Sequence, residues 1–448
     1  MIKVITYGTY DLLHYGHINL LKRAKALGDY LIVGVTAEDF DKSRGKINVQ
    51  QSLMERIENV RQTGLADEII IEEYEGQKID DIRRYNIDIF TVGSDWKGKF
   101  DYLNEYCKVV YLDRTEGVSS SEIRTEQKAM KLGFAGEYVD VLKKYYQESS
   151  FVNGANCAGI CTFGQPLEME SKEEPKIYRS YEELLQNSDA IYLASAPKEH
   201  DKQIQQALQK GRHVLCESPV CEDPDQYIAL KKLAEEKHLI LMETIKTAFA
   251  TAYDRMMLLI KSGRIGEVVS IDAACTSMKD VNDPIYQSIG WNSFATWAPT
   301  AALPIFQLLG TAYTQKQILS WRADNPAFDV FTKINFTYPN AAASLQVGAG
   351  VKSEGELIIS GTKGYVYVPA PWWKTDYFEI RYENASDNKR YFYQLEGEGI
   401  RYAIVSFLQS IESGRTNAYI STLTSQAIAK LMQDFNAEKD TVLLHKEK

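Results

Sequence analysis

The stretch that decides the fold is Val4-Ile5-Thr6-Tyr7-Gly8-Thr9-Tyr10-Asp11-Leu12-Leu13-His14-Tyr15-Gly16-His17. Residues 2 to 5 form a β-branched apolar run, which is typical of a buried strand. Gly8 ends that run, and apolar residues at helical spacing from 18 to 27 predict a helix that starts near His17. In a strand–loop–helix arrangement, backbone N–H groups and the positive end of the helix dipole point to the same place. Such a place favours a phosphate.

Two histidines, His14 and His17, stand at the end of this loop. Imidazoles at this spacing on a helical turn can face one point, and near neutral pH each can donate a hydrogen bond or carry a proton. Gly16 keeps side-chain bulk out of the space between them. The pair suits the stabilisation of charge on a phosphate during transfer. The alternatives are that the histidines are surface or capping residues, or half of a metal site.

Two later segments favour the phosphate interpretation. Val92-Gly93-Ser94-Asp95-Trp96-Lys97-Gly98-Lys99-Phe100 and Arg114-Thr115-Glu116-Gly117-Val118-Ser119-Ser120-Ser121-Glu122-Ile123 follow predicted strands, as the first stretch does. Together the three segments resemble the glycerol-3-phosphate cytidylyltransferases, a family of small enzymes with a His-x-Gly-His motif. The resemblance extends over residues 1 to about 126 without a large gap.

The resemblance implies roles for individual residues. His14 and His17 hold the triphosphate and stabilise the transition state, and Arg114 binds phosphate. Lys46 lies in a segment that resembles the lysine-bearing loop closing over the phosphates, although the alignment there needs a one-residue shift. The other positions that the resemblance assigns to nucleotide or substrate binding are Gly8, Thr9, Tyr10, Asp11, Gly16, Arg44, Arg56, Gly93, Asp95, Trp96, Thr115, Ser119 and Ser120.

Four of these assignments have a structural alternative. Taken singly, Arg44, Lys46 and Arg56 are typical of a solvated basic surface, and Trp96 is typical of a packed core aromatic. Strand and helix patterns alternate from 30 to 112, which predicts a parallel sheet with helices on both faces. Ligands bind beyond the carboxyl ends of such strands, so the three segments are expected to converge on one edge.

The implied reaction is attack by a phosphomonoester on the α-phosphate of CTP, with pyrophosphate leaving. Positioning and charge neutralisation carry such a transfer. Mg²⁺ is expected with CTP and without dedicated protein ligands, because this ion keeps its waters and binds phosphates readily. The phosphate acceptor is expected to be a small phosphorylated polyol.

The rest of the chain predicts two further domains. Strands and helices alternate again from about 131 to 242, and strand patterns dominate from about 265 to 400 before two terminal helices. The fold class is therefore α/β: a Rossmann-like domain at 1–127, a second Rossmann-like domain at 128–247 and a largely antiparallel sheet domain at 248–448.

This second half resembles the Gfo/Idh/MocA oxidoreductases, which join a nucleotide-binding domain to a sheet domain for substrate binding and often for dimer contacts. The resemblance is carried by four segments: Ser195–His200, Gly211–Pro219, Met242–Thr247 and Ile359–Tyr365. Cofactor positions carried over from that family are Gly136, Ser195, His200 and Glu217. A homodimer or higher homo-oligomer is expected on the same ground.

The departures from that family fall at its working positions. Tyr138 and the acidic Glu137 stand in the loop that should approach a pyrophosphate, Ser218 replaces a lysine, and Thr300 lies near the usual acid/base position. NAD(P) is therefore doubtful as a cofactor, and hydride transfer is expected to be lost. His200 and Lys246 are then core polar groups. The aromatic segment 365–373 is either a carbohydrate platform or a buried sheet edge or dimer contact.

Composition sets the remaining bounds. A formal net charge of −10 argues against nucleic acid, and no apolar run is long enough for membrane insertion. The six scattered cysteines favour reduced thiols in the cytoplasm. The predicted function is a cytidylyltransferase for cell-surface polymer synthesis with an inactive oxidoreductase-like module. The alternatives are a bifunctional reductase and transferase, or a transferase regulated by a ligand-sensing scaffold.

Overall fold

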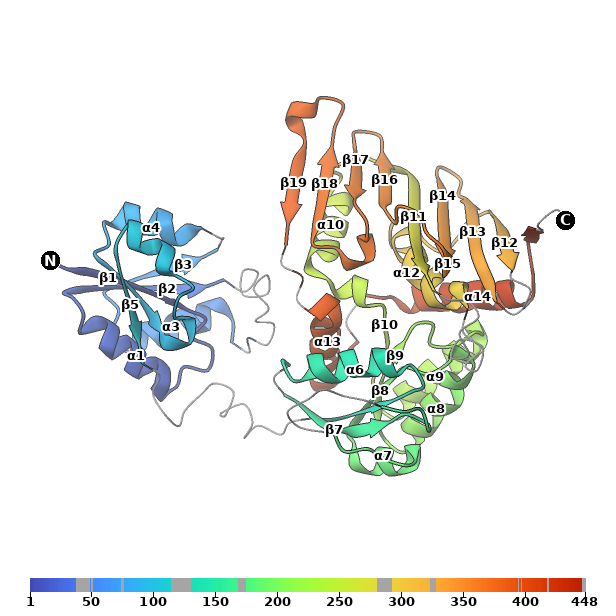
Figure 1. Ribbon diagram of the computed structural model, residues 1–448, viewed down its shortest axis with the longest axis horizontal. Coiled ribbons are helices and arrows are strands. Elements are labelled where there is room, and N and C mark those ends of the chain that lie inside the picture. Colours follow the sequence, from blue (N-terminus) through green and yellow to red (C-terminus); the bar gives the residue numbers. More distant parts are fainter. Residues whose placement is uncertain are drawn as a thin grey trace. The chain divides into compact units, whose positions relative to one another are not determined.

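The computed structural model describes the chain in two compact units, Met1–Ala129 and Met130–Lys448 (Figure 1). The described residues are 1–37, 49, 51–73, 76–113, 130–152, 154–167, 175–279, 292–322, 328–393, 395, 397–416 and 419–444. Within these ranges, no helix combines the length and the apolar character that crossing a membrane requires.

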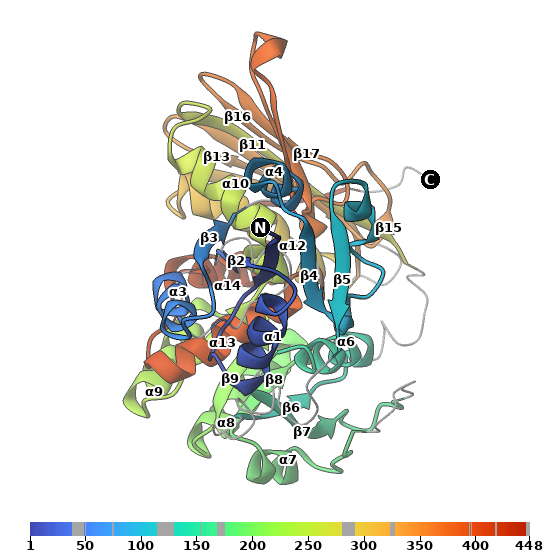
Figure 2. The same ribbon diagram turned by 90° about the vertical axis from the view of Figure 1, so that its left-hand side faces the viewer.

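The first unit is a doubly wound parallel sheet with strand order β3-β2-β1-β4-β5. Its strands are β1 (Lys3–Gly8), β2 (Tyr30–Thr36), β3 (Glu68–Glu72), β4 (Ile89–Gly93) and β5 (Lys108–Leu112). Its helices are α1 (Tyr15–Lys25), α3 (Leu53–Gln62) and α4 (Gln77–Tyr85), with short turns η1 (Ser94–Trp96) and η2 (Asp101–Glu105). Figure 2 turns this unit toward the viewer.

Two apolar cores cover the two faces of this sheet. Val4 packs with residues of α1 and α3, whereas its neighbour Ile5 packs with residues of α4 and η2. Successive side chains of a strand point to opposite faces, so the two helix pairs cover opposite sides. The predicted parallel sheet with helices on both faces is confirmed.

The helices begin where local capping fixes them. Helix α1 starts at Tyr15 rather than near His17, because His14 caps it and accepts a hydrogen bond from the backbone of Gly16. Helix α3 starts after Ser52, whose hydroxyl and backbone form a capping box with Glu55.

The second unit opens with another parallel sheet, in the order β10-β9-β8-β6-β7. Its strands are β6 (Met130–Ala135), β7 (Ala155–Cys161), β8 (Ala190–Leu193), β9 (His213–Glu217) and β10 (Leu241–Thr244). The helices that follow the strands are α6 (Val139–Ser149), α7 (Tyr181–Asn187), α8 (Pro197–Gln209) and α9 (Pro224–Glu236). Helices α7, α8 and α9 share one core, and α6 packs on the opposite face through stacked Tyr145 and Tyr192.

The remainder is a ten-stranded sheet with helices (Figure 1). Its strands are β11 (Val268–Met278), β12 (Gln315–Arg322), β13 (Asp329–Thr337), β14 (Ala342–Gly348), β15 (Gly350–Val351), β16 (Leu357–Gly361), β17 (Tyr365–Val368), β18 (Tyr377–Arg381), β19 (Lys389–Phe392) and β20 (Thr441–Leu444). The helices and turns are η3 (Lys246–Phe249), α10 (Thr251–Lys261), α12 (Ser293–Leu309), η4 (Trp372–Lys374), η5 (Ala385–Asp387), η6 (Gly397–Gly399), α13 (Ile400–Ser413) and α14 (Thr422–Asn436).

This large sheet is mixed rather than uniformly antiparallel, because β11 pairs with β14 and β12 with β20 in parallel. Its register aligns the buried residues Ile271, Ala343, Ile359, Val366 and Ile380 in one row. That row faces a helical layer that includes α12, which the sequence patterns did not predict.

The two tryptophans of the aromatic segment 365–373 are buried. Trp372 is fully buried and donates its indole N–H to the carbonyl of Ala274 at 2.9 Å, and Trp373 is 7% exposed. These two rings belong to the packed core of the second unit and offer no surface to a carbohydrate, whereas Tyr365 and Tyr367 are half-buried.

Ion pairs join the two halves of the second unit. Glu398 in η6 pairs with Lys246 after β10, with Lys374 of η4 at 2.5 Å and with Lys144 of α6 at 3.5 Å. Burial alone would raise the pKa of Glu398, but hydrogen bonds from Lys246 and Lys374 bring that pKa down to about 2. The carboxylate therefore stays charged at neutral pH and links the parallel sheet to the large sheet.

A buried carboxyl group makes the stability of the second unit depend on pH. Burial raises the pKa of Asp329 to about 7, above its value in an unfolded chain. The stabilisation from the protonated form is complete below pH 4 and is lost as the pH rises toward 7. Above pH 7 this group no longer changes the free energy of unfolding as the pH rises. We predict that Asp329→Asn raises the melting temperature relative to the unaltered protein by roughly 5 °C at pH 8 but not at pH 4.

The matched control is Asp140→Asn, because the side chain of Asp140 is 97% exposed. Calorimetry at both pH values should show no pH-dependent difference for the control. An equal shift for Asp329→Asn at pH 4 and pH 8 would show that Asp329 is not the titrating group.

Candidate active site

The signature loop leaves the carboxyl end of β1 through an unusual backbone. Tyr10 and Leu12 adopt left-handed conformations with φ of 52° and 48°. The ring of Tyr10 is 2% exposed and lies edge-on to His17 with ring centroids 5.5 Å apart. Glycine suits position 8, because a Cβ there would lie only 3.0 Å from the Tyr10 ring. The buried Tyr10 ring thus supports His17 from within the domain.

His14 and His17 form a stacked pair at the start of α1. Their ring centroids are 3.9 Å apart and both side chains are half-buried. The Nδ1 atom of His14 accepts the N–H of Gly16 at 3.1 Å, so the proton of the neutral ring lies on Nε2. His14 is therefore a capping residue, one of the alternatives above, and the same bond turns its Nε2–H into a hydrogen-bond donor.

Buried polar contacts hold the loop from below. Arg56 is fully buried and its Nη1 donates to the carbonyls of Thr9 and Thr36, each at 2.8 Å. Asp11 is 2% exposed and accepts the N–H of Gln51 at 3.0 Å. The solvated-surface interpretation of Arg56 is wrong: its guanidinium ties the loop to β2.

The second predicted segment reaches the same edge of the sheet. Strands β1 and β4 are adjacent and parallel, so Gly8 and Gly93 both lie at carboxyl ends. After Gly93, Asp95 is exposed, and Trp96 is half-buried with its ring centroid 5.8 Å from that of Phe100. The convergence of these two loops on one edge is confirmed. Their roles in nucleotide binding stay predictions.

Six of the predicted site residues lie outside the described residues. They are Arg44, Lys46, Arg114, Thr115, Ser119 and Ser120. Their contribution to the site therefore rests on the sequence alone.

One buried charge cluster at this edge escaped the sequence analysis. Lys78 of α4 is 7% exposed, pairs with the fully buried Glu72 at the end of β3, and lies 4.7 Å from the ring centroid of Tyr7. The Tyr7 hydroxyl donates to Asp81 at 2.8 Å, and its burial and the nearby Asp81 raise the pKa of Tyr7. On a polar helix face these residues look solvated, so the pattern gave no signal for the cluster.

The cofactor positions of the second unit cluster at the carboxyl edge of its parallel sheet. Gly136 follows β6 and lies against β8, where a Cβ would be 2.0 Å from the carbonyl oxygen of Ala194. Ser195 follows β8, and Glu217 ends β9. His200 of α8 is 1% exposed, and its Nδ1 lies 2.9 Å from the carbonyl oxygen of Pro219. Gly136 is thus explained by packing alone.

The residues at this edge do not fit a dinucleotide. The N–H of Tyr138 donates to Ala194 at 3.1 Å and the N–H of Val139 donates to Glu137 at 3.0 Å, so two donors that should cradle a pyrophosphate are used internally. Glu137 itself accepts the N–H of Ala196 at 3.3 Å, at the start of α8. A carboxylate of the chain therefore occupies a place that suits an anion.

The neighbouring polar groups support this mismatch. Ser218, at the position of the family's lysine, donates its hydroxyl to Glu243, and burial raises the pKa of Glu243 and of Glu217. Burial lowers the pKa of His200 to about 4, so that ring is neutral. The Lys246 ammonium lowers the pKa of Glu217 against the effect of burial, and it is itself paired with Glu398.

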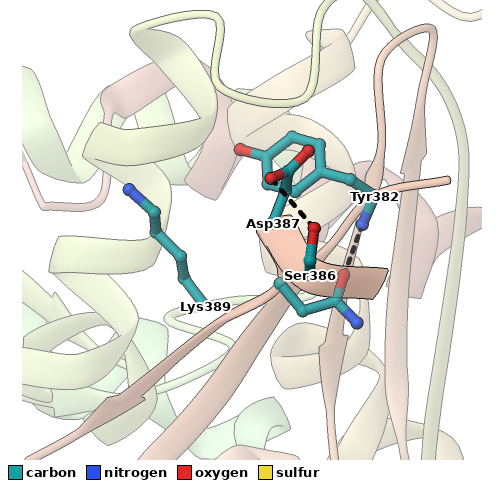
Figure 3. A pocket seen from close by; sticks show the side chains of 5 residues that line it. Tyr382, Ser386, Asp387 and Lys389 are labelled. Atoms are coloured by element: carbon teal, nitrogen blue, oxygen red, sulfur yellow. Dashed lines mark hydrogen bonds between the residues drawn. The ribbon is translucent and has the colours of Figure 1, made fainter. Parts of the chain in front are cut away.

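The structure offers other hollows and no metal centre in its described part. A surface pocket at the β18–β19 hairpin is lined by Tyr382, Ser386, Asp387, Asn388 and Lys389 (Figure 3). Its hydrogen bonds, such as the Tyr382 N–H to Asn388 at 2.8 Å, shape the hairpin turn, and no predicted site residue lines it. The described residues contain no group of three or more potential metal ligands, and the six cysteines are free.

The comparisons with known proteins match the first unit and the second unit to different families. The cytidylyltransferase-like family model matches residues 5–126. The glycerol-3-phosphate cytidylyltransferase of Bacillus spizizenii is 47% identical over 135 residues, which are 29% of this chain and 100% of that protein. The enzyme of the same name from Bacillus subtilis is 50% identical over 129 residues, 28% of this chain and 97% of that protein. The chain therefore belongs to the cytidylyltransferase-like family, and it is a nucleotidyltransferase.

The second unit matches a different family. A model of the oxidoreductase family with an NAD-binding Rossmann fold, the Gfo/Idh/MocA family, matches residues 144–245. A 3-ketoreductase from Actinomadura kijaniata, solved with NADP and TDP-benzene, aligns with a TM-score of 0.63 at 17% identity, over 71% of this chain and 100% of that chain. A UDP-N-acetylglucosamine 3-dehydrogenase from Acidithiobacillus ferrooxidans gives 0.57 at 16% identity, over 70% and 98%. At this identity the likeness shows the fold of the second unit.

The His14 contact predicts a tautomer that can be measured. Because Nδ1 accepts the Gly16 N–H, neutral His14 carries its proton on Nε2. Nitrogen-15 NMR of labelled protein above pH 8 should assign His14 to the Nε2–H form. Gly16→Pro removes this donor and should allow a measurable population of the Nδ1–H form. An Nδ1–H ring in the unaltered protein would contradict the capping geometry.

Proposed function

We propose that this protein condenses CTP with glycerol 3-phosphate to give CDP-glycerol and pyrophosphate. One observation carries the proposal: the stacked His14 and His17 rings at the N-terminus of α1, on the carboxyl edge of a doubly wound sheet. Curated enzymes with this activity, as their names state, are matched over nearly their full length by the first unit. CTP and glycerol 3-phosphate are thus the substrates that the relatives support.

The chemistry requires charge neutralisation more than covalent catalysis. An oxygen of the acceptor phosphate forms a bond to the α-phosphorus of CTP, and the bond from that phosphorus to the β-phosphate oxygen breaks, so pyrophosphate leaves with the electron pair. The Nε2–H of His14 and the N-terminal N–H groups of α1 stabilise the charge that grows on the phosphate oxygens. Mg²⁺, bound by the phosphates, supplies further neutralisation.

Residues outside the described ranges complete the proposed site. Lys46 and Arg114 neutralise the phosphates, with Arg44, Thr115, Ser119 and Ser120 as further contacts. Asp95 and Trp96 contact the nucleoside after β4. These roles follow from the family resemblance and from the shared edge of Gly8 and Gly93.

For the second unit we propose a role without hydride transfer. The internally bonded N–H groups of Tyr138 and Val139, the Glu137 carboxylate at α8 and the Ser218–Glu243 contact argue against NAD(P). The unit then serves homo-oligomer formation or substrate handling. A CDP-activated polyol donates polyol phosphate units, so the protein is proposed to supply cell-surface polymer synthesis from the cytoplasm.

The first test is pyrophosphate release from CTP across a panel of phosphorylated polyols. Glycerol 3-phosphate should give the highest kcat/KM, and His14→Ala and His17→Ala should each lower turnover at least about a hundredfold, the usual scale for one transition-state contact. His238→Ala, at an exposed turn of the second unit, is the control and should keep full activity. Absence of release with every acceptor overturns the proposal, and full activity of either active-site variant overturns the histidine roles.

The second test concerns the nicotinamide cofactors. The full-length protein should neither enhance NADH or NADPH fluorescence nor gain thermal stability with millimolar cofactor, because the required donors already have partners inside the protein. The same protein should shift its melting temperature with CTP and Mg²⁺, which serves as the positive control. Saturable NAD(P)H binding would instead support the bifunctional alternative.

A further inference from the structure

Gln51, which has no assigned role, contacts the signature loop twice. Its backbone N–H donates to the Asp11 carboxylate at 3.0 Å, and its side-chain Oε1 accepts the backbone N–H of Leu12 at 2.9 Å. Leu12 is one of the two left-handed residues of the loop. A leucine in this conformation is disfavoured unless its surroundings hold it. The amide of Gln51 provides that restraint.

Gln51 is itself fixed in place by α3. It precedes Ser52, the capping residue of the helix, and its carbonyl accepts from Nε of Arg56 at 3.1 Å. Asn59, two turns into α3, donates from Nδ2 to the Oε1 of Gln51 at 3.1 Å. This second donor sets the orientation of the amide, so Oε1 rather than Nε2 faces the loop. The Asn59 contact therefore helps to fix the acceptor that the Leu12 N–H uses.

The contact lies next to the catalytic pair in the chain. Leu13 alone separates Leu12 from His14, whose ring caps α1 and stacks on His17. A shift of the Leu12 backbone therefore moves the residue that carries the Nε2–H donor. Small displacements of catalytic groups cost large factors in rate. Gln51 also borders the segment that contains Lys46, since only residue 50 separates it from Val49.

We propose that Gln51 is a positioning residue that holds the signature loop in its active conformation by clamping Asp11 and Leu12. The proposal rests on the proposed nucleotidyl transfer. In this proposal Gln51 does not contact the substrate. It acts on His14 through the signature loop. Its loss therefore lowers kcat more than it weakens CTP binding.

The test compares two Gln→Met variants, one directly before the capping residue of α3 and one at the last residue of α3. Gln51→Met removes the Oε1 acceptor while keeping side-chain length and the backbone bond to Asp11. It should lower kcat at least about tenfold while the KM for CTP changes less than about threefold, because positioning is lost. Gln62→Met is the matched control, since Gln62 is exposed and, among the described residues, its side chain bonds to Glu58 within α3. The control should keep the unaltered kcat.

A second readout does not depend on activity. Hydrogen exchange of the Leu12 amide should speed up in Gln51→Met and stay unchanged in Gln62→Met, at equal melting temperatures. Asn59→Ala should also lower kcat and speed up Leu12 exchange, but by less. The kcat of the double variant Gln51→Met with Asn59→Ala should be no lower than that of Gln51→Met alone. This non-additivity separates a shared contact from general loosening of α3.

Each of these results either supports or overturns the role proposed for Gln51. Unaltered kcat in Gln51→Met, or a kcat loss without faster Leu12 exchange, overturns the proposal. If Gln51→Met does not fold, Asn59→Ala decides: unchanged kcat and unchanged exchange overturn the proposal. If the unaltered protein releases no pyrophosphate, the proposed function fails, whereas the exchange comparison still tests the clamp.

Discussion

A single buried guanidinium joins the parts of the first unit that form its candidate site. Arg56 binds the carbonyls of Thr9 in the signature loop, Thr36 at the end of β2 and Gln51 before α3. The loop needs such support, because its left-handed residues each cost about 1 kcal/mol relative to ordinary backbone. The stacked histidines at α1 thus depend on contacts made beneath the loop. An arginine suits this place because its planar fork can bind several carbonyls and remains charged when buried.

The second unit has the same sheet architecture, but polar groups at the carboxyl edge of its sheet bond to one another. Where a dinucleotide-binding loop leaves N–H groups open, Tyr138 and Val139 give theirs to carbonyls of the chain, and Glu137 takes the N-terminus of α8. The ion pairs of Glu398 with Lys144, Lys246 and Lys374 then connect the parallel and the large sheet. These contacts support the proposal that the second unit keeps this fold without hydride transfer.

Sequence patterns predicted the architecture well where local periodicity is strong. The predicted alternation of strands and helices from 30 to 112 and from about 131 to 242 matches the observed run from β2 to β5 and from β6 to β10. Helix α12 was missed because Pro299 and Pro304 interrupt its pattern, and packing of its apolar side chains on the large sheet overrides their cost. Strand β20 was missed because a short edge strand gains its partner, β12, only from the tertiary fold.

The candidate site divides in the same way. His14, His17, Gly93 and Trp96 stand in motifs, so the sequence could place them at one edge. Arg56 appeared to be a surface cation, and Lys78 with Asp81 appeared to be a solvated helix face, because their burial depends on neighbours distant in the chain. Gln51 gave no signal at all, since its role comes from hydrogen bonds to backbone groups of a loop far along the sequence.

Phosphorus NMR of one reaction mixture tests the central claim most directly. The mixture contains the full-length protein, CTP, glycerol 3-phosphate, Mg²⁺ and NAD⁺, because glycerol 3-phosphate can donate a hydride to NAD⁺ but cannot accept one from NADH. The structure predicts a pair of coupled diphosphate resonances from a CDP-linked polyol, growing in step with pyrophosphate, while no NADH absorbance develops. Unchanged signals of CTP and glycerol 3-phosphate, or formation of NADH, would contradict a chain whose chemistry resides in its first unit.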